Sequence, residues 1–219
     1  MKFFTVLTSL GAKERLALSF RYMKDDPQNN IRVIPPLLRR EVTLHEPYSG
    51  DYIHGYMVNA GFSENVMKWH RQHPGIPLRF FWDKWEEEPV KRVDNTLSFY
   101  QLDDVEFLRQ MAGCKAYAST AGFESVCEAM YLGKPILMVP AHIEQDCNAY
   151  DAEKSGAGII SSDFNLQQLL EFAKDYHPNR DFVYWVRGAE YTLLNLLESD
   201  SSNYQQVLFN EMYLVEEFI

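Results

Sequence analysis

The sequence contains no apolar run approaching the roughly 20 residues that a membrane-spanning helix requires, so we expect no transmembrane segment and at most peripheral contact with a membrane. Positive charge is also scarce, because 21 lysines and arginines stand against 31 aspartates and glutamates, which gives a formal charge of −10. A surface that binds nucleic acid needs basic residues to neutralise phosphate, so nucleic acid is not an expected partner.

Cysteine is scarce as well, with Cys114, Cys127 and Cys147 as its three occurrences. They form no C-x-x-C pair and have no histidine at metal-ligand spacing. We therefore expect reduced thiols in a cytoplasmic compartment, no metal site and no cofactor. An apolar fraction of 46% is nevertheless enough for a folded core.

The first 50 residues differ from the rest of the chain. Residues 1–10 read as a strand rather than a signal peptide, because threonines break the apolar stretch and charged residues follow at once. Residues 31–34 also read as a strand, and Pro35 and Pro36 form a rigid break before a linker at 45–50. The basic residues of this segment form either a solvated face or a local basic patch.

From residue 51 onward, apolar runs of strand length alternate with helical patterns, which is typical of a parallel sheet with crossover helices. The predicted strands are 52–58, 78–82, 97–100, 115–119, 135–139 and 157–161. The predicted helices between them are 62–73, 103–112, 121–132 and 144–155, with 83–96 as an exposed connection and Val105, Leu108 and Met111 as a core-facing stripe. We predict an α/β fold, a Rossmann-like parallel sheet flanked by helices. Further helices are predicted at 166–176, 181–197 and 205–217, which give a helical tail over 176–219.

The most informative stretch follows the predicted strand 115–119. Small residues make a tight turn there before a helix begins, so unpaired backbone amides point into the crevice at the carboxyl edge of the sheet and attract phosphate. Gly122 lets a backbone approach closely without a Cβ in the way, while Ser119 and Thr120 cap the helix or donate to phosphate oxygens. The residues of this turn are Ser119, Thr120, Ala121, Gly122 and Phe123.

Glu128 lies one and a half turns into the same helix, where a carboxylate can accept hydrogen bonds from paired hydroxyls. On this stretch alone, a surface charge on an ordinary capped helix is an equally good interpretation. A second polar cluster follows the next strand, and it begins another helix at the same edge of the sheet. Its members are His142, Glu144, Gln145 and Asn148. Amides and a carboxylate offer the donors and acceptors that sugar hydroxyls need.

Three motifs occur in order over about forty residues: S-T-A-G-F-E-S-x-x-E-A, G-K-P-x-x-x-V-P and E-Q-x-x-N-A with S-G-A-G behind it. Together they resemble the carboxyl-terminal, donor-binding domain of two-lobed GT-B glycosyltransferases of families 28 and 1. The nearest branch contains the N-acetylglucosaminyltransferase of peptidoglycan synthesis, and the resemblance covers roughly residues 51–175.

The resemblance implies a role for each matching position. Glu128 would hold the donor ribose, residues 119–123 would meet the diphosphate, and Glu144, Gln145 and Asn148 would contact the donor sugar. His142 precedes this cluster at the mouth of the site, where it is either an ordinary exposed histidine or an imidazole that pairs with phosphate or positions a leaving group. Tyr100, Gln101 and Leu102 would flank the base. Asn59, Gly61 and Ser63, after the first strand, resemble a second loop that faces the diphosphate, although a plain strand-to-helix turn would look the same. The implied donor is a nucleotide sugar, with uridine as the expected base, and no metal is implied.

Two features depart from the family pattern. Glu124 places a negative charge close to the expected diphosphate, which puts phosphate affinity in doubt. About 50 residues precede the donor domain, too few for an acceptor lobe, so residues 1–50 read as the remnant of such a lobe and its linker, and the catalytic residues stay unknown.

The alternatives are a non-catalytic subunit or fragment that needs a separate acceptor-binding lobe, a sugar-nucleotide epimerase, and an α/β domain with an unrelated ligand. If the aromatic residues of the tail are exposed, we expect a homodimer.

Overall fold

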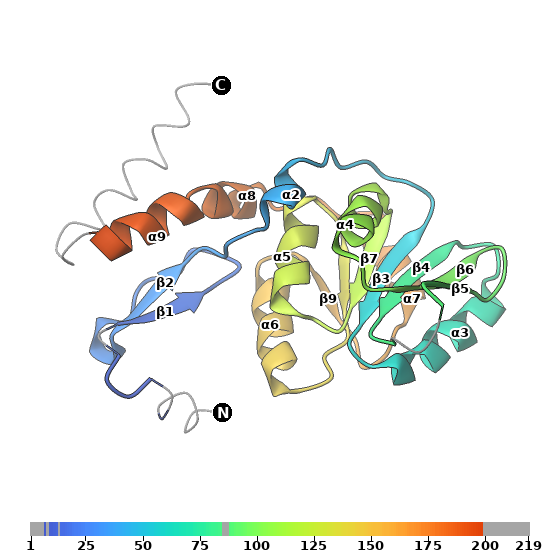
Figure 1. Ribbon diagram of the computed structural model, residues 1–219, viewed down its shortest axis with the longest axis horizontal. Coiled ribbons are helices and arrows are strands. Elements are labelled where there is room, and N and C mark those ends of the chain that lie inside the picture. The colour runs from blue at the N-terminus through green and yellow to red at the C-terminus, as the bar shows by residue number, and fades with distance from the viewer. Residues whose placement is uncertain (1–6, 8, 13, 85–87, 199–219) are drawn as a thin grey trace. The chain divides into compact units, whose positions relative to one another are not determined.

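The computed structural model describes residues 7, 9–12, 14–84 and 88–198 (Figure 1). Its chain forms two compact units. The larger unit is Leu38–Arg180, and the smaller unit combines Met1–Leu37 with Asp181–Ile219. Each unit is described below by itself.

The larger unit is built on one twisted sheet. Its strands are β3 (Ile53–Met57), β4 (Leu78–Trp82), β5 (Val90–Arg92), β6 (Leu97–Gln101), β7 (Ala116–Ser119), β8 (Ile136–Met138) and β9 (Gly158–Ile160). Their order across the sheet is β5-β6-β4-β3-β7-β8-β9. Every neighbouring pair is parallel except β5 with β6, which is antiparallel.

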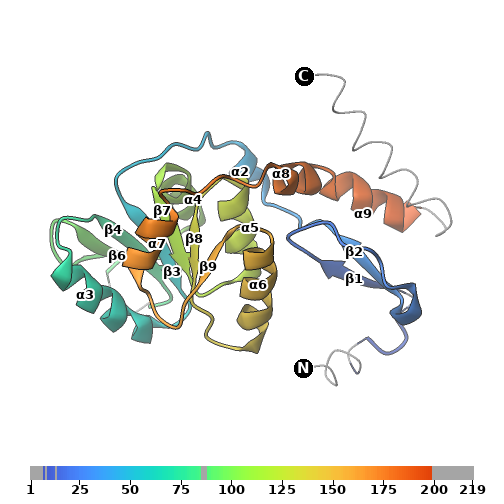
Figure 2. The same ribbon diagram turned by 180° about the vertical axis from the view of Figure 1, so that it is seen from behind.

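Helices cover both faces of this sheet, as the two opposite views show (Figures 1 and 2). The helical elements are α2 (Arg40–Thr43), the 3-10 turn η2 (Ala60–Phe62), α3 (Ser63–Gln72), α4 (Asp104–Gly113), α5 (Phe123–Tyr131), α6 (Ile143–Lys154) and α7 (Leu166–Phe172). Val66 and Trp69 of α3 and Leu166 and Leu169 of α7 enter the main apolar cluster on one face. Helices α4, α5 and α6 cover the other face. The predicted α/β fold with a mostly parallel, helix-flanked sheet is confirmed.

Alternation along β3 explains how one strand serves both faces. Ile53 and Met57 point into the apolar cluster shared with α3 and α7. His54, one residue along, points the other way and packs against the rings of Phe107 on α4 and Tyr117 on β7. Both faces are therefore covered, which is why the strands read as continuous apolar runs in the sequence.

The smaller unit contains β1 (Arg15–Leu18) and β2 (Ile31–Ile34), which pair in parallel, with the 3-10 turn η1 (Pro27–Asn29) between them. It also contains α9 (Ala189–Glu198) and most of α8 (Arg180–Arg187). The indole Nε1 of Trp185 donates a hydrogen bond of 3.0 Å to the carbonyl of Ser19. This bond ties the helical segment to the segment that follows β1.

Several predicted elements need correction. The strand at 31–34 is confirmed, but the helix expected over 181–197 is two helices that separate at Gly188. The connection 83–96 contains the strand β5, and Val105 is 73% exposed rather than part of the core. Most of the strand expected at 1–10 and all of the helix expected at 205–217 lie outside the described residues, although Ser9, Leu10 and Gly11 form a turn. Within the described ranges, no helix is long and apolar enough to cross a membrane.

Candidate functional site

The strand order of the larger unit creates one topological switch point. Chain order runs from β3 outward through β4 to β6, and then returns to the other side of β3 for β7, β8 and β9. The carboxyl ends of β3 and β7 lie side by side, with Tyr56 opposite Ser119. In open parallel sheets, the crevice outside such a pair of strand ends is where ligands bind. The loops after β3 and β7 are two of the segments that the sequence analysis selected.

The turn after β7 is held by its own side chains. Ser119 Oγ accepts a hydrogen bond of 3.0 Å from the amide of Ala121, and both residues are buried. Ala121 adopts a left-handed conformation with φ of 61°, whereas Gly122 has a φ of −62° that any residue can adopt. The strained residue of the turn is therefore Ala121. A Cβ on Gly122 would meet its nearest neighbour, Ser125 Oγ, at 3.6 Å, so the chain itself leaves room there.

Helix α5 begins directly after this turn, with Gly122 at its N-cap. Among the described residues, no side chain caps it, so the expected capping by Ser119 or Thr120 is wrong. Both of these side chains are fully buried and bond to loop backbone instead. The α5 N-terminus therefore places its partial positive charge at the switch point.

The loop after β3 is fastened to the loop after β7. Thr120 donates its amide to the carbonyl of Tyr56 at 3.3 Å, and Thr120 Oγ1 accepts from the amide of Val58 at 3.4 Å. Within the first loop, Asn59 Oδ1 accepts from the amide of Gly61 at 2.8 Å, which caps the 3-10 turn. Asn59 and Gly61 are exposed, while Ser63 is buried at the start of α3.

Glu128 of α5 has no exposed side-chain surface, and Arg39 binds it through two parallel hydrogen bonds. Arg39 Nε lies 2.6 Å from Oε1 and Nη2 lies 2.8 Å from Oε2. The guanidinium also reaches Asp104 Oδ1 at 3.1 Å and Glu124 Oε1 at 3.6 Å. Burial raises the pKa of the Glu128 carboxyl, and the hydrogen bonds from Arg39 oppose that rise.

This arrangement resolves two points from the sequence. Glu128 is not a surface charge, so the plain capped-helix interpretation of this residue is wrong. Glu124, whose charge put phosphate affinity in doubt, stands beside a guanidinium that offsets it. Arg39 was not among the predicted site residues, because it lies 89 positions from Glu128 and has no motif around it. Asp104, which begins α4, was not among them either.

The cluster that begins α6 divides into two pairs. His142 and Glu144 are exposed. Gln145 is buried, and its Oε1 accepts from the amide of Ala141 at 2.8 Å. Asn148 donates from Nδ2 to the carbonyl of Ala121 at 3.2 Å, which fastens α6 to the turn after β7. The second pair therefore holds the frame of the site, and the first pair faces solvent.

The residues at the end of β6 are separated from β7 by two strands, β4 and β3. The Tyr100 ring stacks on Phe81 with centroids 5.1 Å apart, Gln101 donates its amide to the carbonyl of Pro89, and Leu102 is exposed. The chain then returns to the switch point at Asp104, which contacts Arg39. In the described part of the chain, no group of three His, Cys, Asp or Glu residues could hold a metal ion.

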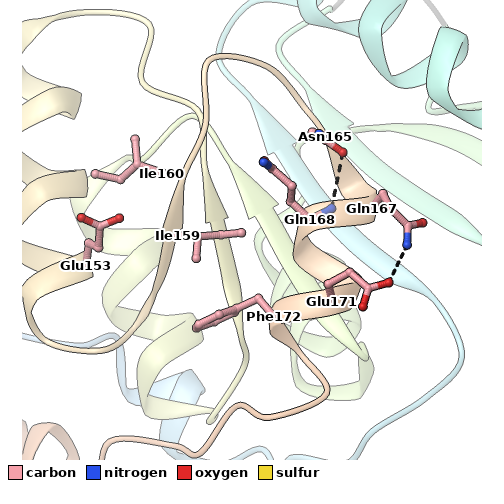
Figure 3. Close-up of a pocket in the computed structure, with 8 residues that line it drawn as sticks. All are labelled: Glu153, Ile159, Ile160, Asn165, Gln167, Gln168, Glu171 and Phe172. Carbon is pink, nitrogen blue, oxygen red and sulfur yellow. Dashed lines mark hydrogen bonds between the residues drawn. The ribbon is translucent and has the colours of Figure 1, made fainter.

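A separate surface depression of about 500 Å³ lies at the β9 edge of the sheet (Figure 3). Its floor is Ile159, Ile160 and Phe172, and its rim is polar, with Gln167 Nε2 donating to Glu171 Oε1 at 2.7 Å. None of the predicted site residues lines it. The depression is therefore not the site that the motifs indicate.

Comparison with known proteins agrees with this geometry. Residues 10–176 match the pattern of glycosyl transferase family 1. A curated relative, the putative UDP-glucuronosyltransferase ugt-48 of Caenorhabditis elegans, is 26% identical over 105 residues, which are 47% of this chain and 20% of the relative.

Two solved structures share the fold. The glycotransferase of kitacinnamycin has a TM-score of 0.56 at 15% identity, over 81% of this chain and 51% of that one. The Arabidopsis thaliana protein UGT89C1, solved in complex with UDP, has a TM-score of 0.50 at 13% identity, over 74% of this chain and 47% of that one. This chain thus spans about half the length of these structures and a fifth of the curated relative. Because the family pattern matches most of the sequence, the chain belongs to glycosyl transferase family 1.

Proposed function

We propose that this chain binds a UDP-linked sugar at the switch point of its sheet and acts as the donor half of a hexosyltransferase. The observation that carries the proposal is the meeting of three features: the two fastened loops, the uncapped α5 N-terminus and the buried Glu128. A helix N-terminus favours a diphosphate, and a carboxylate one and a half turns further in suits ribose hydroxyls.

Each predicted residue has a proposed role in this complex. Residues 119–123 and the loop of Asn59, Gly61 and Ser63 meet the diphosphate. Glu128 accepts from the ribose hydroxyls, and the base lies between the α5 side of the crevice and residues 100–102. Glu144 and His142 contact the sugar, because they are the exposed members of the α6 cluster. Gln145 and Asn148 act by holding the loops in place.

Relatives favour uridine as the base. The curated relative is named as a putative UDP-glucuronosyltransferase, and UGT89C1 was solved with UDP. The donor sugar is left open, and UDP-N-acetylglucosamine enters the first trials because the motifs resemble the N-acetylglucosaminyltransferase branch. Transfer to an acceptor hydroxyl would be stabilised at the leaving diphosphate by the α5 N-terminus rather than by a bound metal.

An acceptor-binding lobe or subunit is the second part of the proposal. The solved structures that share this fold are about twice as long as the part that this chain covers. We propose that a separate lobe or subunit supplies the acceptor site and the base that activates the acceptor, in the cytoplasm. A non-catalytic donor-binding subunit is the alternative, and it would bind the nucleotide sugar without turnover when the acceptor lobe is added.

The first test is thermal unfolding of the full chain with and without UDP, ADP, GDP and UDP-N-acetylglucosamine. A ligand present at about 100 times its Kd should stabilise the folded state by roughly 2.7 kcal/mol. We expect stabilisation by the uridine ligands, and its loss in Glu128→Gln. The matched control is Glu171→Gln, which removes an exposed carboxylate from the β9 edge and should respond like the unaltered chain.

Calorimetric titration with UDP covers the case in which Glu128→Gln lowers stability too far for a thermal comparison. A folded, unaltered chain that binds none of these nucleotides would refute the proposed function. Binding of ADP or GDP in preference to UDP would keep the donor site and overturn the choice of base.

A further inference from the structure

Arg39 stands at the centre of the best-defined charge cluster in the larger unit. Its guanidinium binds both oxygens of Glu128 and also contacts Asp104 and Glu124. The exposures of these partners differ sharply, because the Glu128 side chain is 0% exposed, whereas Asp104 is 79% and Glu124 is 65% exposed. The arginine therefore contacts one buried carboxylate and two solvent-exposed carboxylates.

The electrostatic surroundings make Glu128 depend on this arginine. Desolvation raises the pKa of the Glu128 carboxyl, and the charges of Glu124 and Asp104 raise it further. Tyr117 on β7 and the neighbouring thiol of Cys127 also lie near the carboxylate, but both are buried groups with raised pKa values and carry no positive charge. Among the described residues that act on Glu128, Arg39 is the cation that lowers its pKa.

The same contacts block the proposed ligand. Two of the roughly four lone-pair positions of a carboxylate are used by Arg39, and no part of the Glu128 side chain is exposed. Ribose hydroxyls can therefore reach Glu128 after the guanidinium has shifted. Asp104 and Glu124 already lie within 3.6 Å of it, so the guanidinium can shift without becoming unpaired.

We propose that Arg39 is a positioning residue of the donor site. Its guanidinium pairs with the Glu128 carboxylate in the free chain, and it moves to pair with Asp104 and Glu124 when ribose hydroxyls bind Glu128. This inference rests on the proposed function, because it needs a ribose at Glu128. The inference also explains Glu124, whose charge departs from the family pattern. Its carboxylate is one of the two partners that the Arg39 guanidinium pairs with after it leaves Glu128.

The test compares UDP with 2′,3′-dideoxy-UDP, which lacks both ribose hydroxyls, by calorimetric titration of the full chain at several pH values from 6.0 to 8.5. The unaltered chain should prefer UDP by at least about tenfold, because hydrogen bonds to an ionised group are strong. In Arg39→Met, the buried Glu128 carboxyl loses the cation that opposes the rise of its pKa, so a larger share of it is protonated. The preference for UDP should therefore be smaller than in the unaltered chain, and the difference should be greatest at the lowest pH.

Affinity for 2′,3′-dideoxy-UDP should change by less than about twofold in Arg39→Met, because that ligand makes no use of Glu128. Arg39→Lys keeps the charge but cannot form two parallel bonds, so its preference should be intermediate and independent of pH. This variant also serves if Arg39→Met does not fold. The matched control is Arg40→Met, which removes the adjacent exposed arginine and should leave the preference unchanged.

Three results would overturn the inference. Equal loss of both nucleotides at every pH would mean that Arg39 binds the diphosphate directly. An unchanged preference in Arg39→Met and Arg39→Lys would mean that the ion pair is structural. An unaltered chain that binds neither nucleotide would remove the proposed function, and this inference with it, whereas the first two results would leave the proposed function standing.

Discussion

Acidification should destabilise this chain through His54, which is enclosed by aromatic rings. Its imidazole has no exposed surface, and the ring centroids of Phe107, Phe81 and Tyr117 lie 4.8, 5.3 and 5.3 Å away. Neither ring nitrogen has a hydrogen-bond partner among the described residues. Burial therefore lowers the pKa of His54 to about 3.

The size and the sign of the effect follow from this shift. In the unfolded chain His54 titrates near its ordinary pKa of about 6.5, so below that pH the unfolded state binds a proton that the folded state rejects. Stability is complete above about pH 6.5 and falls as the pH drops toward 3. A pH of 4.5 lies about two units below the pKa of His54 in the unfolded chain and above its pKa in the folded chain. Protonation of the unfolded chain therefore lowers the free energy of unfolding by roughly 2.7 kcal/mol at this pH.

Urea unfolding at pH 7.0 and 4.5 would measure this loss in three chains. His54→Leu replaces the imidazole with an apolar group of similar size, so it should lose about 2.7 kcal/mol less than the unaltered chain on acidification. His177→Gln, which removes an exposed histidine, should behave like the unaltered chain. The pKa of Asp94 is lowered, chiefly because its carboxylate accepts a hydrogen bond from the Thr96 amide. Protonation of Asp94 in acid therefore also lowers the stability of the fold. It is present in all three chains and cancels in the comparison. An equal loss in His54→Leu and the unaltered chain would refute this reasoning.

Three further predictions concern stability and can be measured by the same urea titrations. Arg39→Met should cost about 3 kcal/mol because it leaves a buried carboxylate unpaired, and adding Glu128→Leu should recover most of that loss; strictly additive losses would contradict the pairing. Gly158→Ala should cost about 3 kcal/mol because its Cβ would overlap the carbonyl oxygen of Ile136 on β8, whereas Gly75→Ala, with nothing within 4 Å, should be near neutral. Lys134→Met should cost about 2 kcal/mol because it leaves two carbonyls without their ammonium donor, and an unchanged midpoint would count against those bonds.

The sequence was a good guide to the sheet because its parallel strands are buried on both faces. Runs such as the one that became β4 are uniformly apolar and bounded by turn residues, so their limits are sharp. β5 was missed because its three residues are exposed and show no alternation. Val105 was misplaced because an apolar residue in the first turn of α4 fits the helical period but lies beyond the edge of the core.

The site was predictable in part for a related reason. The loops at the switch point follow from strand ends and small residues, which are local features of the sequence. The partner of Glu128 is not local, since Arg39 lies 89 residues away and no periodic pattern connects the two positions. The bonds that Gln145 and Asn148 make to the backbone of the site likewise could not be predicted, because they join α6 to residues before it and to the turn after β7.

Those backbone bonds have a consequence for how a new sugar preference could be reached. Thr120 joins the loop after β3 to the turn after β7, and Asn148 joins that turn to α6, so a substitution at either position would disturb two segments of the frame together. Glu144 and His142 carry no such connection in the structure described here, and both are exposed. Under the proposed function, variation at these two positions would change which sugar the site accepts while the frame keeps its shape, so a directed-evolution library should begin with them.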